Sequence, residues 1–258
     1  NPKPRVFRLV EDEALINRLG FNNHGAKIIK ERIKRNKKLG LLGINVGPNK
    51  DSNDRLNDYL IGLKTFCDDA DYITINISSP NTENLRTFHE SDKLQDLLKS
   101  IMEERKNLKS NIPIVVKVSP DLSEDQVNKI SEILLQYEIE AIIVSNTSEA
   151  TRDKLTNIQS HQKGGLSGKP IEQKSNILIN KFYKLLKGKI KIIGVGGVDS
   201  GQAAYDKFIA GADFIQLYTG MVFNGPNIAG IIKKDLKELL IRDGVKNYTE
   251  IVGNKTLS

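Results

Sequence analysis

The chain has 258 residues, a net charge of +7 and a hydrophobic fraction of 38%. This length is sufficient for one large domain with a buried core, and the composition is that of an ordinary globular protein. No apolar run reaches the ~18 residues that a membrane-spanning helix needs. The single cysteine, Cys67, excludes a disulfide within the chain, and its place on an apolar helix stripe predicts a packing role.

The positive charge does not indicate nucleic-acid binding. Such binding needs Lys and Arg gathered on one face together with stacking aromatic side chains. Here the basic residues are scattered, many of them on the outer faces of helices, as at Lys233, Lys234 and Lys237. An anionic substrate, a phosphate-bearing cofactor or acidic lipids would explain the charge equally well, and no nucleic-acid partner is expected.

In chain order, the segment before Leu41 shows no convincing strand and is predicted as a loop followed by a helix around Ala26–Lys37. Six short Ile- and Val-rich runs then follow, each nearly continuous in apolarity, which is typical of parallel strands buried on both faces. They are Leu41–Val46, Tyr72–Ile77, Ile114–Val118, Ala141–Ser145, Ile190–Gly194 and Phe214–Tyr218.

Apolar residues at helical spacing lie between these strands and predict amphipathic helices. The stripes are Leu56–Cys67, Leu94–Met102, Val127–Tyr137 and Ile231–Leu240, with a further helix predicted over Asp199–Ile209. Ser123 and Gln126 form a capping-box pattern. The repeated strand–helix order predicts a parallel sheet with right-handed crossovers. Six strands leave two architectures open: an open doubly wound sheet, or a (β/α)8 barrel whose first two strands precede this chain.

Three glycine clusters point to a phosphate site. Gly194–Gly197 and Gln216–Gly220 end consecutive strands, and Gly164–Gly168 follows the strand ending in Ser145. Glycines let backbone N–H groups approach a phosphate closely, and barrels bind phosphate after their last strands. A Rossmann fingerprint is excluded, because the third glycine of that pattern is replaced by Asp199. The alternative is that these glycines only form tight turns.

Polar residues at the strand ends indicate a ligand with amide-like groups. Asn side chains both donate and accept hydrogen bonds, and a lysine in a barrel mouth suits a site where negative charge develops. The residues concerned are Asn45, Asn76, Ser78, Ser79, Lys117, Asn146 and Thr147. The alternatives are turn and cap roles for the Asn and Ser residues and a structural ion pair for the lysine. The three histidines lack metal-ligand spacing, and no metal site is expected.

Taken in order, these motifs resemble the dihydroorotate dehydrogenase family, in its quinone-reducing class. The resemblance rests on Asn17–Asn23, Gly43–Gly47, Asn76–Thr82 with Leu85–Arg86, Val116–Leu122, Ser145–Thr147, Gly164–Gly168, Gly194–Gly197 and Gln216–Thr219. It implies one catalytic domain over residues 1–258, an FMN-binding (β/α)8 TIM barrel. The first two barrel strands and an N-terminal helical domain are expected to be missing from the chain, in agreement with the count of six strands.

The resemblance also implies roles for individual residues. Ser79 aligns with the catalytic base, where the related soluble class has cysteine. The flavin contacts are expected at Asn45, Asn76, Lys117, Ser145, Gly168, Gly197, Tyr218 and Thr219. The contacts to dihydroorotate are expected at Asn17, Arg18, Leu19, Gly20, Phe21, Asn76, Asn81, Asn146 and Thr147.

The implied reaction converts dihydroorotate to orotate, with FMN as cofactor and a membrane quinone as electron acceptor. The resemblance further implies a monomer at the bacterial inner membrane, or the mitochondrial one, held peripherally through the missing N-terminal segment. Three alternatives are kept: another FMN-dependent barrel oxidoreductase, a flavin-free barrel that binds a sugar phosphate, and a non-enzymatic basic binding module.

Overall fold

The computed structural model describes residues 1–36, 39–80, 85–150 and 152–254. Its larger sheet contains six parallel strands in the order β3-β4-β5-β6-β8-β9. Their bounds are Gly43–Val46, Tyr72–Asn76, Ile114–Val118, Ala141–Val144, Lys191–Val195 and Phe214–Gln216. The six strands predicted from the sequence are therefore confirmed, with ends that differ by at most two residues.

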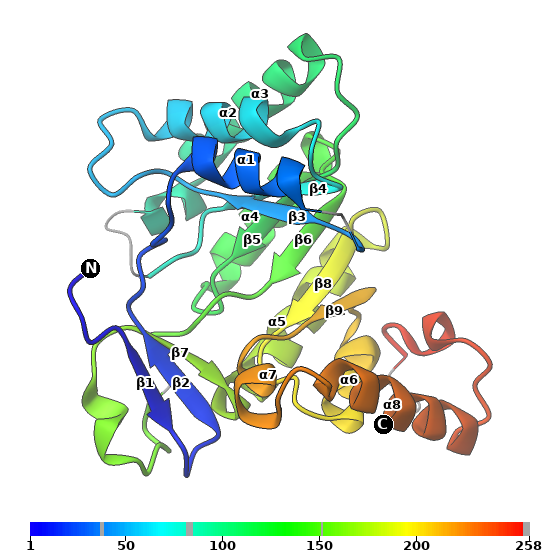
Figure 1. Cartoon of the computed structure of the whole chain (residues 1–258). Coiled ribbons are helices and arrows are strands. Elements are labelled where there is room, and N and C mark those ends of the chain that lie inside the picture. The colour runs from blue at the N-terminus through cyan, green and yellow to red at the C-terminus, as the bar shows by residue number, and fades with distance from the viewer. Residues whose placement is uncertain (37–38, 81–84, 151, 255–258) are drawn as a thin grey trace.

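This sheet curls like the wall of a barrel (Figure 1). The side-chain amide of Gln216 on β9 donates a hydrogen bond of 3.1 Å to the Tyr72 hydroxyl on β4, although β5, β6 and β8 lie between the two strands in the sheet. Strands β3 and β9 are the two edges, and Phe214 on β9 is 52% exposed. The architecture is that of a TIM-barrel-like α/β fold in which six strands are present.

Helices cover the outer face of the curl and bury the main core against it. The helices are α1 (Ala26–Arg35), α2 (Arg55–Phe66), α3 (Ser91–Asn107), α4 (Glu124–Gln136), α5 (Glu172–Leu186), α6 (Gly201–Ala210), α7 (Thr219–Asn224) and α8 (Ile228–Arg242), with short turns η1 (Leu85–His89), η2 (Ile158–His161), η3 (Lys169–Ile171) and η4 (Tyr248–Ile251). The predicted helices are confirmed, and α5 and the short α7 are additions to them. The capping box at Ser123 and Gln126 is present, with hydrogen bonds of 3.2 and 3.0 Å. In the described part of the chain, no helix is long and apolar enough to cross a membrane.

A second, three-stranded antiparallel sheet lies beside the first (Figure 1). It contains β1 (Val6–Leu9), β2 (Ala14–Asn17) and β7 (Gly165–Gly168). The prediction that the segment before Leu41 holds no strand was therefore wrong. Each strand has only four residues. Burial alternates along β1 but not along β2 or β7, so the sheet has no consistent two-residue period. Long-range packing of Leu9, Ile16 and Leu166 stabilises this sheet.

Candidate active site

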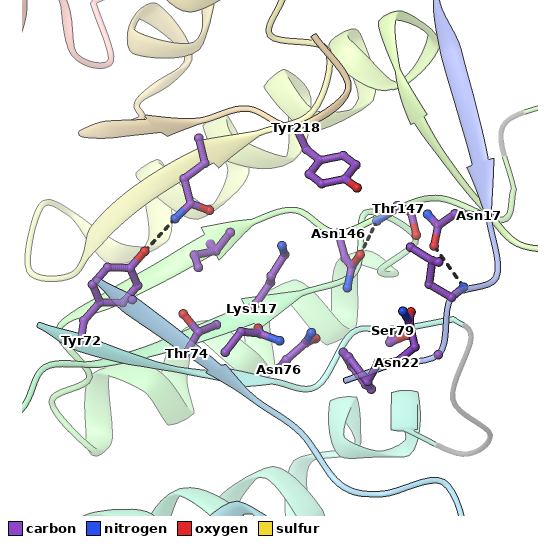
Figure 2. Close-up of a pocket in the computed structure, with 17 residues that line it drawn as sticks. Asn17, Asn22, Tyr72, Thr74, Asn76, Ser79, Lys117, Asn146, Thr147 and Tyr218 are labelled. Atoms are coloured by element: carbon purple, nitrogen blue, oxygen red, sulfur yellow. Dashed lines mark hydrogen bonds between the residues drawn. The ribbon is translucent and has the colours of Figure 1, made fainter. Parts of the chain in front are cut away.

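A cavity of about 430 Å³ lies on the inside of the curled sheet and is lined both by strand residues and by residues that follow the strands. Figure 2 shows its lining. The lining residues are Asn17, Leu19, Gly20, Phe21, Asn22, Gly43, Asn45, Tyr72, Thr74, Asn76, Ser79, Lys117, Ile143, Asn146, Thr147, Gln216 and Tyr218. A second cavity, of about 190 Å³, shares five of these residues and continues toward the ends of β8 and β9: Asn17, Lys117, Asn146, Thr147 and Tyr218. Both sheets therefore contribute to one composite site.

Lys117 is the one cation that lines these two cavities, among the described residues. It is the fourth residue of β5 and points into the inside of the curl (Figure 2). No hydrogen bond or ion pair joins its ammonium to another described residue, and no Asp or Glu among them lines either cavity. Burial lowers the pKa of Lys117. A buried ammonium without an acidic neighbour favours an anionic ligand, or a ligand that becomes negative during a reaction.

Asn76 ends β4 and has its side chain fixed by its neighbour. Its Oδ1 accepts hydrogen bonds from the Ser78 N–H at 3.1 Å and from the Ser78 hydroxyl at 2.8 Å. The Tyr59 hydroxyl donates to the Asn76 backbone carbonyl at 2.7 Å. With its carbonyl oxygen used in this way, the amide nitrogen of Asn76 is the group that remains for a ligand in the cavity.

Asn146 and Thr147 follow β6 and add to the wall of the same cavity. Asn146 Nδ2 donates to the Ser78 hydroxyl at 2.9 Å, and Asn146 Oδ1 accepts from the Thr147 N–H at 2.8 Å. The buried Thr147 hydroxyl oxygen has no hydrogen-bond partner among the described residues. Buried polar groups are normally paired, so this hydroxyl, which packs against Gly165, is an exception among the described residues.

Ser79 lies three residues after the end of β4 and lines the same cavity as Asn76 and Lys117. It is 6% exposed, so a group held in the cavity is shielded from bulk water at this point. A buried hydroxyl beside a cation and several amides can accept or relay a proton once its surroundings favour that transfer. Asn81, the other residue predicted in this loop, lies outside the described residues.

The second cavity is built from hydroxyl groups and close-packed glycine backbone. Gly168 and Gly197 have φ angles of 102° and 74°, which favour glycine. A Cβ atom on Gly168 would overlap the Glu13 carbonyl oxygen, and one on Gly197 would overlap the Glu172 side chain. The Thr219 hydroxyl donates to Ser167 Oγ at 2.9 Å. Backbone N–H groups and hydroxyls in an acid-free cavity are suited to a phosphate.

The structure brings most of the predicted site residues together. The first cavity is lined by Asn45, Asn76, Lys117 and Tyr218 from the predicted flavin set, and by Asn17, Leu19, Gly20, Phe21, Asn76, Asn146 and Thr147 from the predicted substrate set. The second is lined by Ser145, Gly168, Gly197 and Thr219, together with Lys117 and Tyr218. Their roles as contacts remain predictions. Arg18 does not line either cavity: its guanidinium donates to Pro4, Gln162 and Lys163 and stacks on the Phe7 ring.

Several lining residues were not predicted. Tyr72 and Thr74 belong to β4 and share a face with Asn76, because side chains of a strand alternate between its two faces. This two-residue spacing would have identified them once Asn76 had been selected. Gln216 on β9 lacks such a signal, since its approach to Tyr72 depends on the curl of the sheet.

Known proteins resemble this chain in both sequence and structure. A profile of the dihydroorotate dehydrogenase family matches residues 1–240. A dihydroorotate dehydrogenase (quinone) of Bartonella tribocorum is 46% identical over 255 residues, which span 97% of this chain and 71% of the relative. The protein of that name from Agrobacterium fabrum is 42% identical over 255 residues, or 97% and 70% of the two chains.

A solved structure extends this similarity to three dimensions. It is the crystal structure of DHODH from Eimeria tenella in complex with ferulenol, which matches with a TM-score of 0.95 at 32% identity and covers 99% of this chain and 75% of that one. The ligand-free form from the same organism matches with a TM-score of 0.94. The chain belongs to the dihydroorotate dehydrogenase family of oxidoreductases.

Proposed function

We propose that this chain oxidises (S)-dihydroorotate to orotate in pyrimidine biosynthesis, with FMN as its redox cofactor and a quinone as the electron acceptor. The observation that carries the proposal is the composite site. Ser79, Asn76 and Lys117 line the first cavity, and no described Asp or Glu lines it. This cavity continues into a second, glycine-rich one. The names of the family and of its quinone-type members point to the same reaction.

The residues present fit FMN. A flavin mononucleotide combines a flat ring, which needs amide and cationic partners, with a phosphate, which needs N–H and hydroxyl donors. The first cavity offers Asn45, Asn76 and Lys117 for the ring, and the second offers Gly168, Gly197, Ser145 and Thr219 for the chain and phosphate. Tyr218 lines both cavities. When bound, FMN supplies the acceptor for the hydride that leaves C6 of dihydroorotate.

Dihydroorotate matches the remaining surface. Its ring carries amide N–H and C=O groups. An Asn side chain can donate a hydrogen bond to such a C=O group and accept one from such an N–H group. Asn17, Asn76 and Asn146 supply such groups, and Thr147 adds a hydroxyl that has no partner among the described residues. The carboxylate of dihydroorotate is consistent with a cavity whose lining carries a cation and no described acid. Leu19, Gly20 and Phe21 line the same cavity and join the proposed substrate set. We place Arg18 and Asn81 in that set by resemblance alone.

Ser79 is the proposed base that removes the proton from C5. A serine hydroxyl is a weak base at neutral pH and depends on its surroundings for activation. Its burial keeps bulk water from competing for that proton. Lys117 stabilises the negative charge that develops when the proton leaves, because its ammonium faces the same cavity and no described residue pairs with it.

The quinone and the membrane belong to this proposal as well. The acceptor is inferred from the names of the quinone-type relatives. Because such quinones reside in membranes, we propose a peripheral association with the membrane that contains the acceptor, and a monomeric enzyme.

Steady-state turnover tests the proposal. Purified protein is mixed with L-dihydroorotate and a water-soluble quinone, and orotate formation is followed by its ultraviolet absorbance. We expect turnover that needs both the substrate and the quinone. Turnover with a 2-hydroxy acid instead would indicate a different flavin oxidoreductase, and protein that contains no flavin would favour a phosphate-binding barrel.

The Ser79→Ala variant tests the proposed base. Its flavin content is expected to equal that of the wild type, while reduction of the flavin by dihydroorotate slows by about 10²- to 10⁴-fold, the range that a positioned base contributes. Stopped-flow absorbance under anaerobic conditions measures this rate. A variant that is reduced at the wild-type rate would remove Ser79 from the chemistry and leave the substrate assignment intact.

A further inference from the structure

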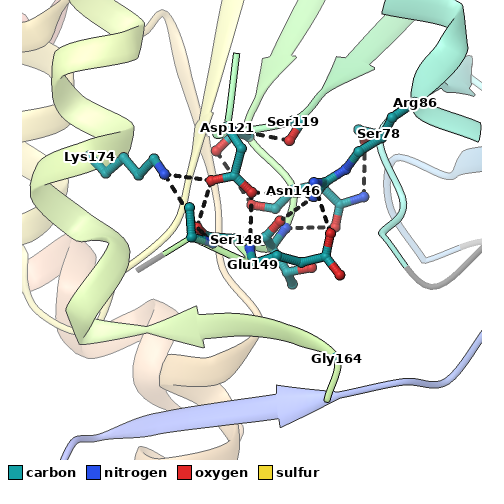
Figure 3. Close-up of polar contacts among 12 residues, drawn as sticks. Ser78, Arg86, Ser119, Asp121, Asn146, Ser148, Glu149, Gly164 and Lys174 are labelled. Atoms are coloured by element: carbon teal, nitrogen blue, oxygen red, sulfur yellow. Dashed lines mark hydrogen bonds and ion pairs between the residues drawn. The ribbon is translucent and has the colours of Figure 1, made fainter. Parts of the chain in front are cut away.

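A cluster of charged residues lies beside Asn146 and Ser148, on the segment that follows β6 (Figure 3). Asp121, three residues after β5, is at its centre. Asp121 Oδ1 accepts from the Ser148 hydroxyl at 2.7 Å and from the Lys174 ammonium of α5. Asp121 Oδ2 accepts from the Glu149 N–H at 2.9 Å and lies 3.4 Å from Arg86 Nη2. One carboxylate therefore connects three different segments of the chain.

Arg86, on η1, is the second cation of the cluster and binds the segment that follows β6. Its Nη2 donates to the Thr147 carbonyl at 3.3 Å, and its Nη1 donates to Glu149 Oε2 at 3.1 Å. A guanidinium can satisfy these acceptors at once, because its donors are arranged in a rigid planar fork. The cluster has two cations and two carboxylates, so its charges balance within the molecule.

Along the segment after β6, some groups line the cavity and the groups next to them contact the charged cluster. Asn146 and the Thr147 side chain line the cavity, whereas the Thr147 carbonyl, the Ser148 hydroxyl and the Glu149 N–H all bind the cluster. Each cavity-lining group is thus held by a neighbour whose hydrogen bonds lie outside the cavity. The cluster is partly exposed, since the Glu149 side chain is 49% and the Lys174 side chain 30% exposed. Ion pairs that solvent reaches contribute little net stability, so a geometric role is the better explanation for the cluster.

Electrostatics keeps the centre of the cluster ionised. Burial would raise the pKa of Asp121, but the hydrogen bonds from Lys174, Ser148 and the Glu149 N–H together outweigh burial, and the pKa lies below its ordinary value. The groups that face Asp121 are Arg86 from η1, Lys174 from α5, and Glu149 from the segment after β6. The carboxylate is charged at neutral pH and keeps its hydrogen bonds there.

We propose that Asp121, with Arg86 and Lys174, is the positioning group that holds Asn146 and Thr147 in place for the amide-bearing ring of the substrate. The three residues line neither cavity and act through the backbone and hydroxyl groups that they bind. This inference rests on the proposed function and adds determinants of substrate affinity that lie outside the site itself.

The Asp121→Asn variant tests this inference, because it keeps the side-chain shape and removes the charge. One of its two side-chain oxygens becomes an N–H donor that faces other donors. We expect the KM for dihydroorotate and the Kd for orotate each to rise about tenfold or more, while kcat and flavin content change by less than about threefold. A tenfold loss of affinity corresponds to about 1.4 kcal/mol, which is the size of one displaced hydrogen bond. Orotate binding is measured from the shift that it causes in the flavin absorbance spectrum.

Asp125→Asn is the matched control. It removes a carboxylate of the same type from an exposed pair with Lys129 on α4, where the two atoms are 2.7 Å apart, and its KM should equal that of the wild type. Arg86→Met should raise KM as Asp121→Asn does, and the double variant should be no worse than the more affected single variant, because both remove one unit. Arg86→Lys, which keeps the charge but loses the fork, should recover only part of the affinity.

The outcomes separate this inference from the function on which it rests. Wild-type protein that neither binds orotate nor oxidises dihydroorotate overturns both. Active wild-type protein with an unchanged KM in Asp121→Asn and Arg86→Met overturns the positioning role alone. A parallel loss of flavin, kcat and melting temperature would mean that the cluster only stabilises the fold, and would also overturn it. If Asp121→Asn does not fold, Arg86→Lys and Arg86→Met decide by the same criteria.

Discussion

The two sheets of this molecule contribute to one site by different means. The six-stranded parallel sheet is buried beneath helices and presents Asn76 and Lys117 from the ends of long-range paired strands. The three-stranded antiparallel sheet has a small core of its own and contributes Asn17 and Gly168. The two sheets therefore divide the roles in the site between them. The parallel sheet holds the charged and chemically active groups rigidly, and the antiparallel sheet closes the cavity beside them.

Lys117→Met is the strongest test of this division. It removes the cation from the parallel sheet at nearly constant side-chain volume, and we expect kcat to fall by about 10²- to 10³-fold, the range for loss of one preorganised electrostatic group. The melting temperature should not fall, because a lysine without an acidic partner is replaced by an apolar side chain. A kcat within threefold of the wild type would place the essential charge elsewhere.

Gly168→Ala tests the contribution of the antiparallel sheet. The left-handed φ of 102° and the adjacent Glu13 carbonyl leave no room for a methyl group, so the β2–β7 pairing shifts and the second cavity narrows. We expect the purified variant to lose most of its flavin, measured as the ratio of flavin to protein absorbance. Gly188→Ala is the control, since Gly188 has a φ of 74° and open space around it. It should cost about 1 kcal/mol of stability and retain its flavin, and equal flavin loss in both variants would contradict the account.

A smaller effect is expected from the fully buried Lys207 of α6, which donates to Ser175 Oγ and Asn176 Oδ1. Burial lowers its pKa to about 8 from 10.5. The unfolded chain then binds this proton more tightly, so the contribution of Lys207 to stability is lowest below pH 8 and increases as the pH rises toward 10.5.

Urea unfolding of the wild type and of Lys207→Met measures this contribution at about pH 7.5 and about pH 10. Relative to the variant, the wild type should gain on the order of 1–3 kcal/mol between these values, and titrations common to both proteins cancel in the difference. A difference that does not change with pH would show that Lys207 has the same pKa in the folded and unfolded chain, as a well-solvated lysine has, and would contradict the lowered pKa.

The same division explains how much of the structure could be predicted from the sequence. The parallel strands were predictable because each is a continuous Ile- and Val-rich run, buried on both faces and followed by polar residues at one common edge. Asn76, Lys117 and Asn146 were identified for that reason, and they do line one cavity.

The antiparallel strands were not predictable in this way, because each has only four residues. Strands β1 and β2 form a short hairpin, and β2 pairs with β7 over a long sequence separation, as Asn17 does with Gly165. The cluster around Asp121 was also missed. Arg86, Asp121, Glu149 and Lys174 lie on four separate segments, and nothing in their spacing along the chain indicates contact. Arg18 was selected by resemblance, and its position away from both cavities depends on contacts with Gln162 and Lys163 that local pattern does not encode.

The central claim is that both sheets together form one site for a flavin and dihydroorotate. Anaerobic addition of L-dihydroorotate to the purified protein tests it most directly, with the visible flavin spectrum as the signal. We expect a flavin band that bleaches on addition and returns when a quinone is added. A flavin band that remains unchanged by dihydroorotate, in protein that retains its flavin, would contradict the account.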